Sequence, residues 1–203
     1  MQTLSWPSHY CNQSFGVIIT TTQETHVVIE DRWDVLDVRT KLVQGIDRRN
    51  WVQFRSCITD AVRLDYSAHD PNRIPGSIAG DRWTAYCRTL FTGLDATQHS
   101  LTNPLVRITG ETATSTVYVV AEHMLRTGGD SKFYTLGGFY EDTLIRINGK
   151  WLLTDMRLAV TWSRGDRSIL AEAMQRGATA LGSSAETIPP GVAIDKSNNR
   201  LAE

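Results

Sequence analysis

The chain of 203 residues contains five histidines, and two of them, His99 and His123, lie in or just before segments with the alternation typical of β-strands. A histidine in such a place is a hydrogen-bonded polar residue, a metal ligand or a general base, because imidazole exchanges a proton near pH ~6.5. Two further candidates are Asp47, after a helical segment, and Tyr66, on the inward face of a predicted strand. Arg146, just before an Asn-Gly pair, completes a set that could transfer a proton and bind a substrate oxygen.

Each of these residues also has a purely structural explanation. An aspartate after a helix is commonly a capping or turn residue, and a histidine of intermediate burial is common in folded proteins. Tyrosine suits a strand face whatever its function, and Arg146 could pair with Asp142 or Asp155 across a hairpin. The choice therefore depends on the elements that position these side chains.

Apolar residues at helical spacing predict four helices. The first is expected from about Glu30, and the third from near Asp81 to Gly93. The predicted segments are 30–46, 51–58, 81–94 and 166–177.

Alternating segments predict the strands, and Asn148-Gly149 between two of them is a strong hairpin signal. We expect His99 in a loop that leads into the second predicted strand, and residues 70–80 in a Pro/Gly-rich loop. Helices mixed with meandering strands define an α+β domain, a cone-shaped curved antiparallel sheet wrapped around helices. Such a sheet leaves an apolar cavity suited to a small molecule. The predicted β segments are 61–69, 105–111, 112–126 and 133–162.

Composition excludes several classes of partner. The net charge is −1 and no basic stripe is present, which argues against nucleic acid or an anionic membrane. The cysteines Cys11, Cys57 and Cys87 form no CxxC pair, so we expect neither a disulfide framework nor a zinc site. No signal peptide or membrane span is predicted, and a cytoplasmic location is expected. The domains are predicted as an N-terminal arm (1–29), an α+β domain (30–178) and a flexible C-terminal tail (179–203).

Five segments in order resemble the SnoaL-like family of the nuclear-transport-factor-two-like superfamily, over roughly residues 30–175. Within it, the chain is similar to scytalone dehydratase and hexachlorocyclohexane dehydrochlorinase. The resemblance implies a cone-shaped α+β barrel that acts without cofactor or metal, as a homotrimer or homodimer. The segments are GIDRRNW, VRLDYS, ATQHSLTN, VYVVAEHM, and IRINGKW with its downstream RLAVTWSRGD.

The resemblance also implies roles for individual residues. Asp47 and His99 match the catalytic dyad, Tyr66 matches a tyrosine nineteen residues after the aspartate, and Arg146 matches an arginine of the dehydrochlorinase. The expected catalytic residues are therefore His99, Asp47, Tyr66 and Arg146, and the expected substrate-binding residues are His123, Tyr140, Trp51 and Trp83.

The chain departs from the family pattern at substrate-recognition positions. A tyrosine of scytalone dehydratase is replaced by Ile46, and its polar pair on a late strand by Gly138 and Tyr140. A lysine of the dehydrochlorinase falls near Leu42. The dyad carries over but the recognition set does not, so scytalone is a poor candidate for the substrate.

An Asp–His pair suits one kind of chemistry. The carboxylate fixes the imidazole tautomer and stabilises the imidazolium, so that the other ring nitrogen can take a proton next to a carbonyl or leaving group. We therefore expect a lyase of the dehydratase type, or an isomerase, acting on a small apolar oxygenated metabolite of secondary metabolism. The alternatives are a non-catalytic ligand-binding or assembly subunit of the same fold and an epoxide-hydrolase-like enzyme. Iron held by Asp47, His99 and His123 is disfavoured, because no compact ligand spacing supports it.

Overall fold

The computed structural model describes residues 22–182. Most of the predicted N-terminal arm and of the predicted C-terminal tail lies outside this range. The domain boundaries predicted near residues 29 and 178 both fall inside helices, because the first helix starts earlier and the last ends later than expected. The segment between Thr22 and Glu30 contains neither Gly nor Pro, so nothing in it stops the helix.

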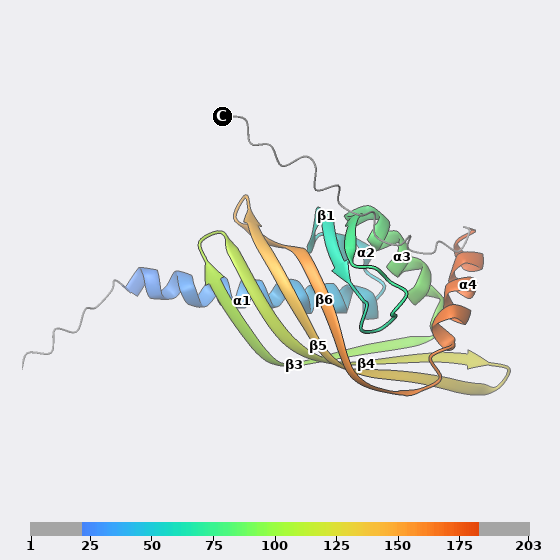
Figure 1. Cartoon of the computed structure of the whole chain (residues 1–203). Coiled ribbons are helices and arrows are strands. Elements are labelled where there is room, and N and C mark those ends of the chain that lie inside the picture. The colour runs from blue at the N-terminus through green and yellow to red at the C-terminus, as the bar shows by residue number, and fades with distance from the viewer. Residues whose placement is uncertain (1–21, 183–203) are drawn as a thin grey trace, which may run out of the picture.

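Residues 22–182 form four helices and six strands (Figure 1). In order they are α1 (Thr22–Asp47), α2 (Trp51–Arg55), β1 (Ile58–Asp65), β2 (Gly76–Ala79), α3 (Gly80–Gly93), β3 (Ala96–Thr109), β4 (Thr112–Thr127), β5 (Asp130–Ile147), β6 (Lys150–Gly165) and α4 (Ile169–Leu181).

The strands form a single curved, unclosed sheet in the order β2-β1-β6-β5-β4-β3. Strands β3 to β6 are an antiparallel meander, as predicted, but β1 pairs with β6 in parallel, so the sheet is not entirely antiparallel. The predicted Asn148-Gly149 turn is confirmed, with φ of 51° and 75°, and it joins β5 to β6. The loop predicted for residues 70–80 instead contains the short strand β2, which pairs with β1.

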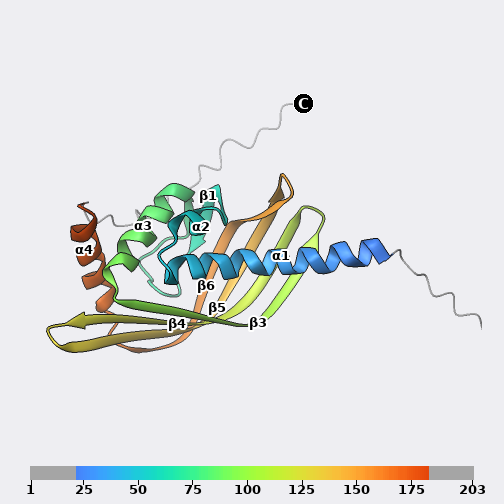
Figure 2. The same cartoon turned by 180° about the vertical axis from the view of Figure 1, so that it is seen from behind.

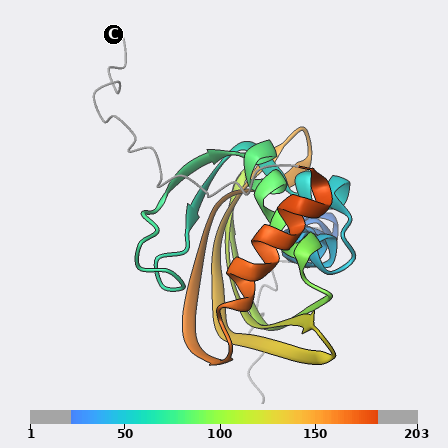
Figure 3. The same cartoon turned by 90° about the vertical axis from the view of Figure 1, so that its right-hand side faces the viewer.

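Two β-bulges place extra residues in β6 opposite β5, and they bend β6 and curve the sheet. The register with β6 shifts between Gly137 and Gly138 and again between Thr143 and Leu144. At the first shift a Cβ on Gly137 would lie 2.1 Å from the ring of Trp162, so only glycine allows this approach. Figure 3 shows the result, a sheet that curls around one side of the molecule while α3 and α4 cover the open side.

Helix α1 crosses the concave face of the sheet and extends beyond it at its N-terminal end (Figure 2). Its buried residues Val35, Leu42 and Ile46 repeat at the predicted spacing and join the core. Arg39 on the same helix is 2% exposed and forms a bidentate ion pair with the buried Asp142 of β5, with Nε donating to Oδ2 at 2.8 Å. This pair fixes the helix to the sheet at a single register.

Helices α3 and α4 pack with their backbones in contact. A Cβ on Gly93 would lie 1.8 Å from the carbonyl oxygen of Ala173, and one on Gly177 would lie 1.8 Å from that of Thr89. The two glycines therefore let α4 lie directly on α3 and close one end of the domain.

Candidate active site

A cavity of about 1120 Å³ lies between the concave face of the sheet, helices α3 and α4, and the segment between β1 and β2 (residues 66–75). Its inner wall is mostly apolar and includes Leu64, Phe91, Ala121, Leu136 and Leu158. This volume is ample for a small organic ligand. The polar side chains that reach it define what chemistry it can support.

Asp47 and His99 form the hydrogen-bonded pair that the sequence predicts. His99 Nδ1 lies 2.8 Å from Asp47 Oδ1, and the backbone N–H of His99 donates to Asp47 Oδ2 at 2.9 Å. Because both carboxylate oxygens bind the same residue, the position and the plane of the imidazole are fixed together. His99 lines the cavity, whereas Asp47 lies behind it as the last residue of α1.

The location of His99 differs from the prediction. It lies within β3, which begins at Ala96, and not in a loop ahead of the strand. A register shift in the β3–β4 pairing between Thr102 and Leu105, with Asn103 at a φ of 51°, interrupts the alternation that strand prediction depends on. Because it is on a strand, the imidazole is held more rigidly than a loop would hold it.

The electrostatics of the pair favour an ionised aspartate. Burial would raise the pKa of Asp47, but hydrogen bonds from His99 and Thr97 outweigh it and lower the pKa below its ordinary value. The ionised carboxylate favours the tautomer in which Nδ1–H donates to it, and in that neutral tautomer Nε2 is the acceptor. Nε2 makes no hydrogen bond to any residue in 22–182, so it is free to accept a proton from a ligand in the cavity.

Two residues that sequence reasoning missed hold the carboxylate in place. Thr97 Oγ1 donates to Asp47 Oδ1 at 3.0 Å, and Arg49 Nη1 donates to Thr97 Oγ1 at 2.9 Å. Arg49 also donates to the carbonyls of Ile46 at 2.7 Å and Leu94 at 3.3 Å. It therefore ties the end of α1 to the start of β3, the two elements that carry the dyad.

His123 lies beside His99, with ring centroids 6.1 Å apart. Its Nδ1 is 3.0 Å from the carbonyl oxygen of Tyr134, so Nδ1 is the protonated nitrogen and Nε2 is an acceptor. Burial and the neighbouring His99 lower the pKa of His123 to about 4. A neutral His123 lines the cavity at neutral pH and can hydrogen-bond a ligand without adding charge.

Tyr66 and Tyr140 line the same cavity as the dyad. Burial raises the pKa of Tyr66 well above its ordinary value and that of Tyr140 to about 12, so both phenols stay protonated. Neither hydroxyl has a hydrogen-bond partner among residues 22–182. The Arg39 guanidinium lies 4.1 Å from the centre of the Tyr140 ring, on the side of the buried pair with Asp142. Both phenols can therefore donate to a ligand oxygen.

Besides Asp47, which lies behind His99, three predicted site residues do not line the cavity, and their predicted placement is wrong. Arg146 donates to Asp31 Oδ2 at 2.5 Å and stacks 4.5 Å from the Trp151 ring, so it neither pairs with Asp142 or Asp155 nor reaches a ligand. Trp51 and Trp83 both belong to the core packing of Phe54, with centroid distances of 6.0 and 5.0 Å. Both side chains therefore pack between α2, α3 and the core.

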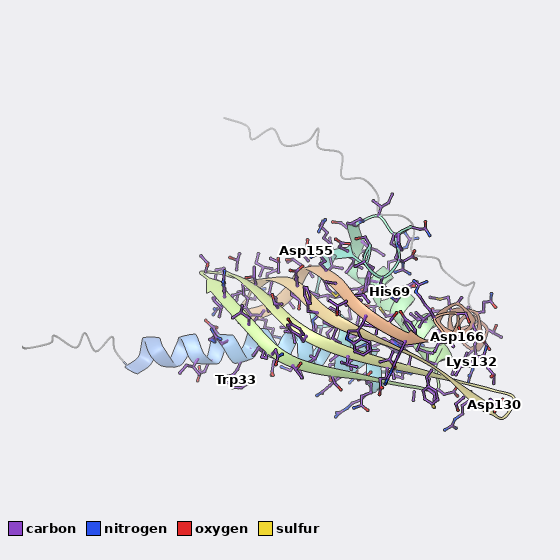
Figure 4. All side chains as sticks on the ribbon, turned by 60° about the horizontal axis from the view of Figure 1, so that its bottom comes forward. Trp33, His69, Asp130, Lys132, Asp155 and Asp166 are labelled. Carbon is purple, nitrogen blue, oxygen red and sulfur yellow. The ribbon has the colours of Figure 1, made fainter. Side chains whose placement is uncertain are left out.

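His69 is a cavity residue that the sequence did not indicate. It lies in the segment between β1 and β2, on the side of the molecule that faces α4 (Figure 4). Its ring makes no hydrogen bond within the described part of the chain, and burial, then the charges of Arg167 and Arg73, lower its pKa to about 4. The sequence predicts His69 at the end of the strand 61–69, but β1 ends at Asp65. The side chain therefore lies in an irregular segment, where strand alternation does not predict its direction.

Across residues 22–182, no helix is both long and apolar enough to span a membrane. Over the same range, no three histidine, cysteine or acidic side chains are grouped so as to hold a metal ion.

The fold and site define the class of protein, a curved α+β domain whose cone holds an Asp–His pair against an apolar cavity. The chain matches the SnoaL-like domain over residues 27–157 and belongs to that family, within the nuclear-transport-factor-two-like superfamily. No protein of curated function matches it significantly in sequence.

Solved structures share this fold. The Kfla4162 protein from Kribbella flavida is 23% identical with a TM-score of 0.64, over 71% of this chain and 98% of that one. A protein named as a candidate scytalone dehydratase from Novosphingobium aromaticivorans is 17% identical with a TM-score of 0.61, over 70% and 92%. The hexachlorocyclohexane dehydrochlorinase LinA-type3 from Novosphingobium barchaimii is 13% identical with a TM-score of 0.59, over 70% and 94%. At these identities the likeness concerns the fold.

Proposed function

We propose that this protein is a cofactor-independent lyase or isomerase that removes a proton next to a carbonyl group of a small, largely apolar substrate. One observation carries the proposal: Asp47 holds His99 through Nδ1 and through the backbone, which leaves Nε2 as a free acceptor at a cavity of about 1120 Å³. A base positioned in this way typically contributes on the order of 10²–10⁴ in rate.

The proposed step is a proton transfer from carbon to His99 Nε2. The electron pair of the broken C–H bond moves toward the carbonyl and forms an enolate, while Asp47 stabilises the imidazolium. In an elimination, that pair then forms the new C=C bond as a hydroxide or halide leaves with its own bonding pair. In an isomerisation, the imidazolium returns the proton at another carbon.

Tyr66 and Tyr140 are suited to the developing charge on the substrate oxygen. Both are protonated donors without partners within residues 22–182, in a low-dielectric site where a hydrogen bond to an oxyanion is strong. His123, neutral and adjacent to His99, is suited to orient the substrate.

The two alternative functions have less support. A non-catalytic subunit of this fold does not require a base directed at an open cavity of this size. An epoxide hydrolase of this fold would require an Asp–Arg–Asp arrangement at the cavity. The buried Arg39–Asp142 pair is an Arg–Asp contact close to Tyr140, but neither of its members lines the cavity.

A minimal substrate tests the proposal. 3-Hydroxy-1-tetralone carries an acidic C–H between a carbonyl and a β-hydroxyl, and loss of water converts it to fluorescent 1-naphthol. We expect the wild-type protein to accelerate this dehydration, and His99→Ala to reduce the rate by on the order of 10²-fold or more.

The matched control is His69→Ala, which removes an imidazole from the same cavity but not from the dyad. We expect this variant to keep most of the activity, and EDTA to leave the wild-type rate unchanged. Equal rates for wild type and His99→Ala would overturn the proposal, as would an activity that EDTA removes and iron or zinc restores.

A further inference from the structure

The cavity is not uniformly apolar, because positive charge gathers on the wall away from the sheet. Three arginines line it, and the only acid among its lining residues is Asp70. We call Arg73, Arg82 and Arg167 the arginine rim. They come from three separate places in the chain: the segment between β1 and β2, the first turn of α3 and the residue pair before α4.

Arg73 is the most enclosed member of the rim: its side chain is 29% exposed, whereas Arg82 and Arg167 are exposed residues. Its guanidinium lies 5.7 Å from the centre of the Tyr66 ring and 5.2 Å from that of Tyr86, and its Nη2 donates to the Tyr86 hydroxyl at 2.5 Å. The two rings therefore hold its planar group at a fixed place in the cavity wall.

The charge of Arg73 is incompletely compensated. Its Nε lies 3.7 Å from Asp70 Oδ2, which is too long for a hydrogen bond, and Nη1 has no hydrogen-bond partner within residues 22–182. Asp70 also accepts from the backbone N–H of Asn72 at 3.1 Å. The unused donors of Arg73 are therefore available to an anionic group of a ligand in the cavity.

Arg167 and His69 show the same excess of positive charge. Arg167 Nη2 donates to the carbonyl oxygen of His69 at 3.0 Å. Within residues 22–182, no carboxylate forms an ion pair with Arg167. After burial, the charges of Arg167 and Arg73 are the largest influences that lower the pKa of His69. A neutral imidazole is thus kept beside the rim, able to donate one hydrogen bond.

We infer that the ligand of this cavity is amphipathic and carries an anionic oxygen group, such as a carboxylate, that binds to Arg73 at the arginine rim. Guanidinium groups bind such oxygens through short, charge-assisted hydrogen bonds. The apolar body of the ligand then lies against Tyr66, the ring shared by the rim and the catalytic cavity. The inference rests on the proposed function only in taking the reacting carbon to be in that apolar body.

A pair of fluorescent probes isolates the contribution of a ligand's negative charge to its binding. 8-Anilinonaphthalene-1-sulfonate and N-phenyl-1-naphthylamine share one apolar body, and only the first carries an anion. We expect Arg73→Gln to lower the affinity for the sulfonate probe by about 10-fold, and to change the affinity for the neutral amine by less than about 2-fold. Retained binding of the amine also shows that the variant is folded.

Arg88→Gln is the matched control, because Arg88 is an exposed arginine of α3 that does not line the cavity. It should leave the affinities for both probes unchanged. Arg167→Gln is the second test variant and should weaken the sulfonate selectively as well. The two probes should compete for one site in the wild type.

The inference is overturned by equal weakening of both probes, by an Arg88→Gln effect as large as that of Arg73→Gln, or by simultaneous binding of the two probes. These titrations are repeated in the His99→Ala background, where we expect the same selectivity. An anion preference that persists there would stand even if 3-hydroxy-1-tetralone were not turned over, so the two proposals can fail independently.

Discussion

Asp47 contacts His99 twice, through the ring and through the backbone, and the two contacts make different contributions. Asp47→Asn keeps a hydrogen-bonding side chain but removes the charge that fixes the tautomer and stabilises the imidazolium. We therefore expect Asp47→Asn to slow 3-hydroxy-1-tetralone dehydration, though less than His99→Ala does, and Tyr66→Phe to be milder again. Steady-state kinetics measure the series. A larger loss for Tyr66→Phe than for His99→Ala would show that the phenol is the primary catalyst.

His123 makes stability depend on pH. In the unfolded chain it titrates near 6.5, whereas in the folded protein its pKa is about 4. Between these values the unfolded state binds the additional proton, so the free energy of unfolding should fall as the pH drops from 6.5 toward 4, by about 3 kcal/mol from this group. Urea denaturation across this range measures it.

His123→Gln should make that dependence shallower. It should not abolish it, because His69 titrates over the same range. The lowered pKa of Asp47 acts in a more acidic range, where its stabilising contribution is lost as the carboxylate protonates. An unchanged pH dependence in His123→Gln would contradict the neutral, buried state of this histidine.

Residue type and spacing in the sequence identified the part of the site that contains the dyad and His123. Asp47, His99 and His123 were located because each lies at the end of, just after or within an element with a clear apolar period. The prediction for Arg146 was wrong because its nearest ion-pair partner is Asp31, more than a hundred residues earlier in the chain, and no local pattern shows such a contact. Residues in irregular segments were missed for the same reason: Arg49, His69 and Arg73.

At the scale of elements, helix and strand periodicity predicted α3, the β4–β5 pairing and the Asn148-Gly149 turn. It did not predict the parallel pairing of β1 with β6, because strand pairing depends on the whole sheet and not on local alternation. It also did not predict the early start of β3, whose alternation is broken at Asn103 and Pro104.

The contact between α3 and α4 depends on two glycines that a substitution can test. Alanine in a helix normally stabilises relative to glycine by about 1 kcal/mol. At Gly93, however, its Cβ would lie 1.8 Å from the carbonyl oxygen of Ala173, so the helices must separate. Because overpacking costs about 1–3 kcal/mol and the clash is with backbone, we expect Gly93→Ala to lower the free energy of unfolding.

Urea denaturation of Gly93→Ala and Gly177→Ala measures this effect. Arg88→Ala, on the exposed face of α3, is the control and should change stability by less than about 0.5 kcal/mol. If Gly93→Ala were more stable than the wild type, α4 would not be packed directly on α3.

At the scale of the whole molecule, the outer face of the sheet is the part left uncovered. Tyr118, Val120 and Trp162 are 49%, 38% and 46% exposed, and Tyr118 packs against Phe139 with ring centroids 5.7 Å apart. Tyr118 and Val120 lie on β4 and Trp162 on β6, with β5 between them, and Val120 and Trp162 both pair with Gly137 of β5. Together with Phe139 they form an apolar surface across the three strands. We propose that a second copy of the chain covers it, in a homotrimer or homodimer.

Light scattering at micromolar concentration tests the assembly. We expect Val120→Glu to shift the mass toward the monomer, since it places a charge in the centre of this face. Val52→Glu is the matched control, because Val52 is 83% exposed on α2 and away from the sheet. A monomeric wild-type protein, or equal effects of the two substitutions, would contradict the proposal.

The backbone contact between α3 and α4 also affects how fast a ligand enters and leaves. Gly93 and Gly177 hold the two helices together, so the gap between them cannot widen without breaking main-chain packing. The opposite wall is the segment between β1 and β2, and β2 is a four-residue edge strand that pairs only with β1. Opening of that segment is the easier route, so its motion should set the residence time of a bound molecule. Arg73 lies in this segment, so the side chain that binds the anionic group of the ligand would also affect how fast the ligand leaves.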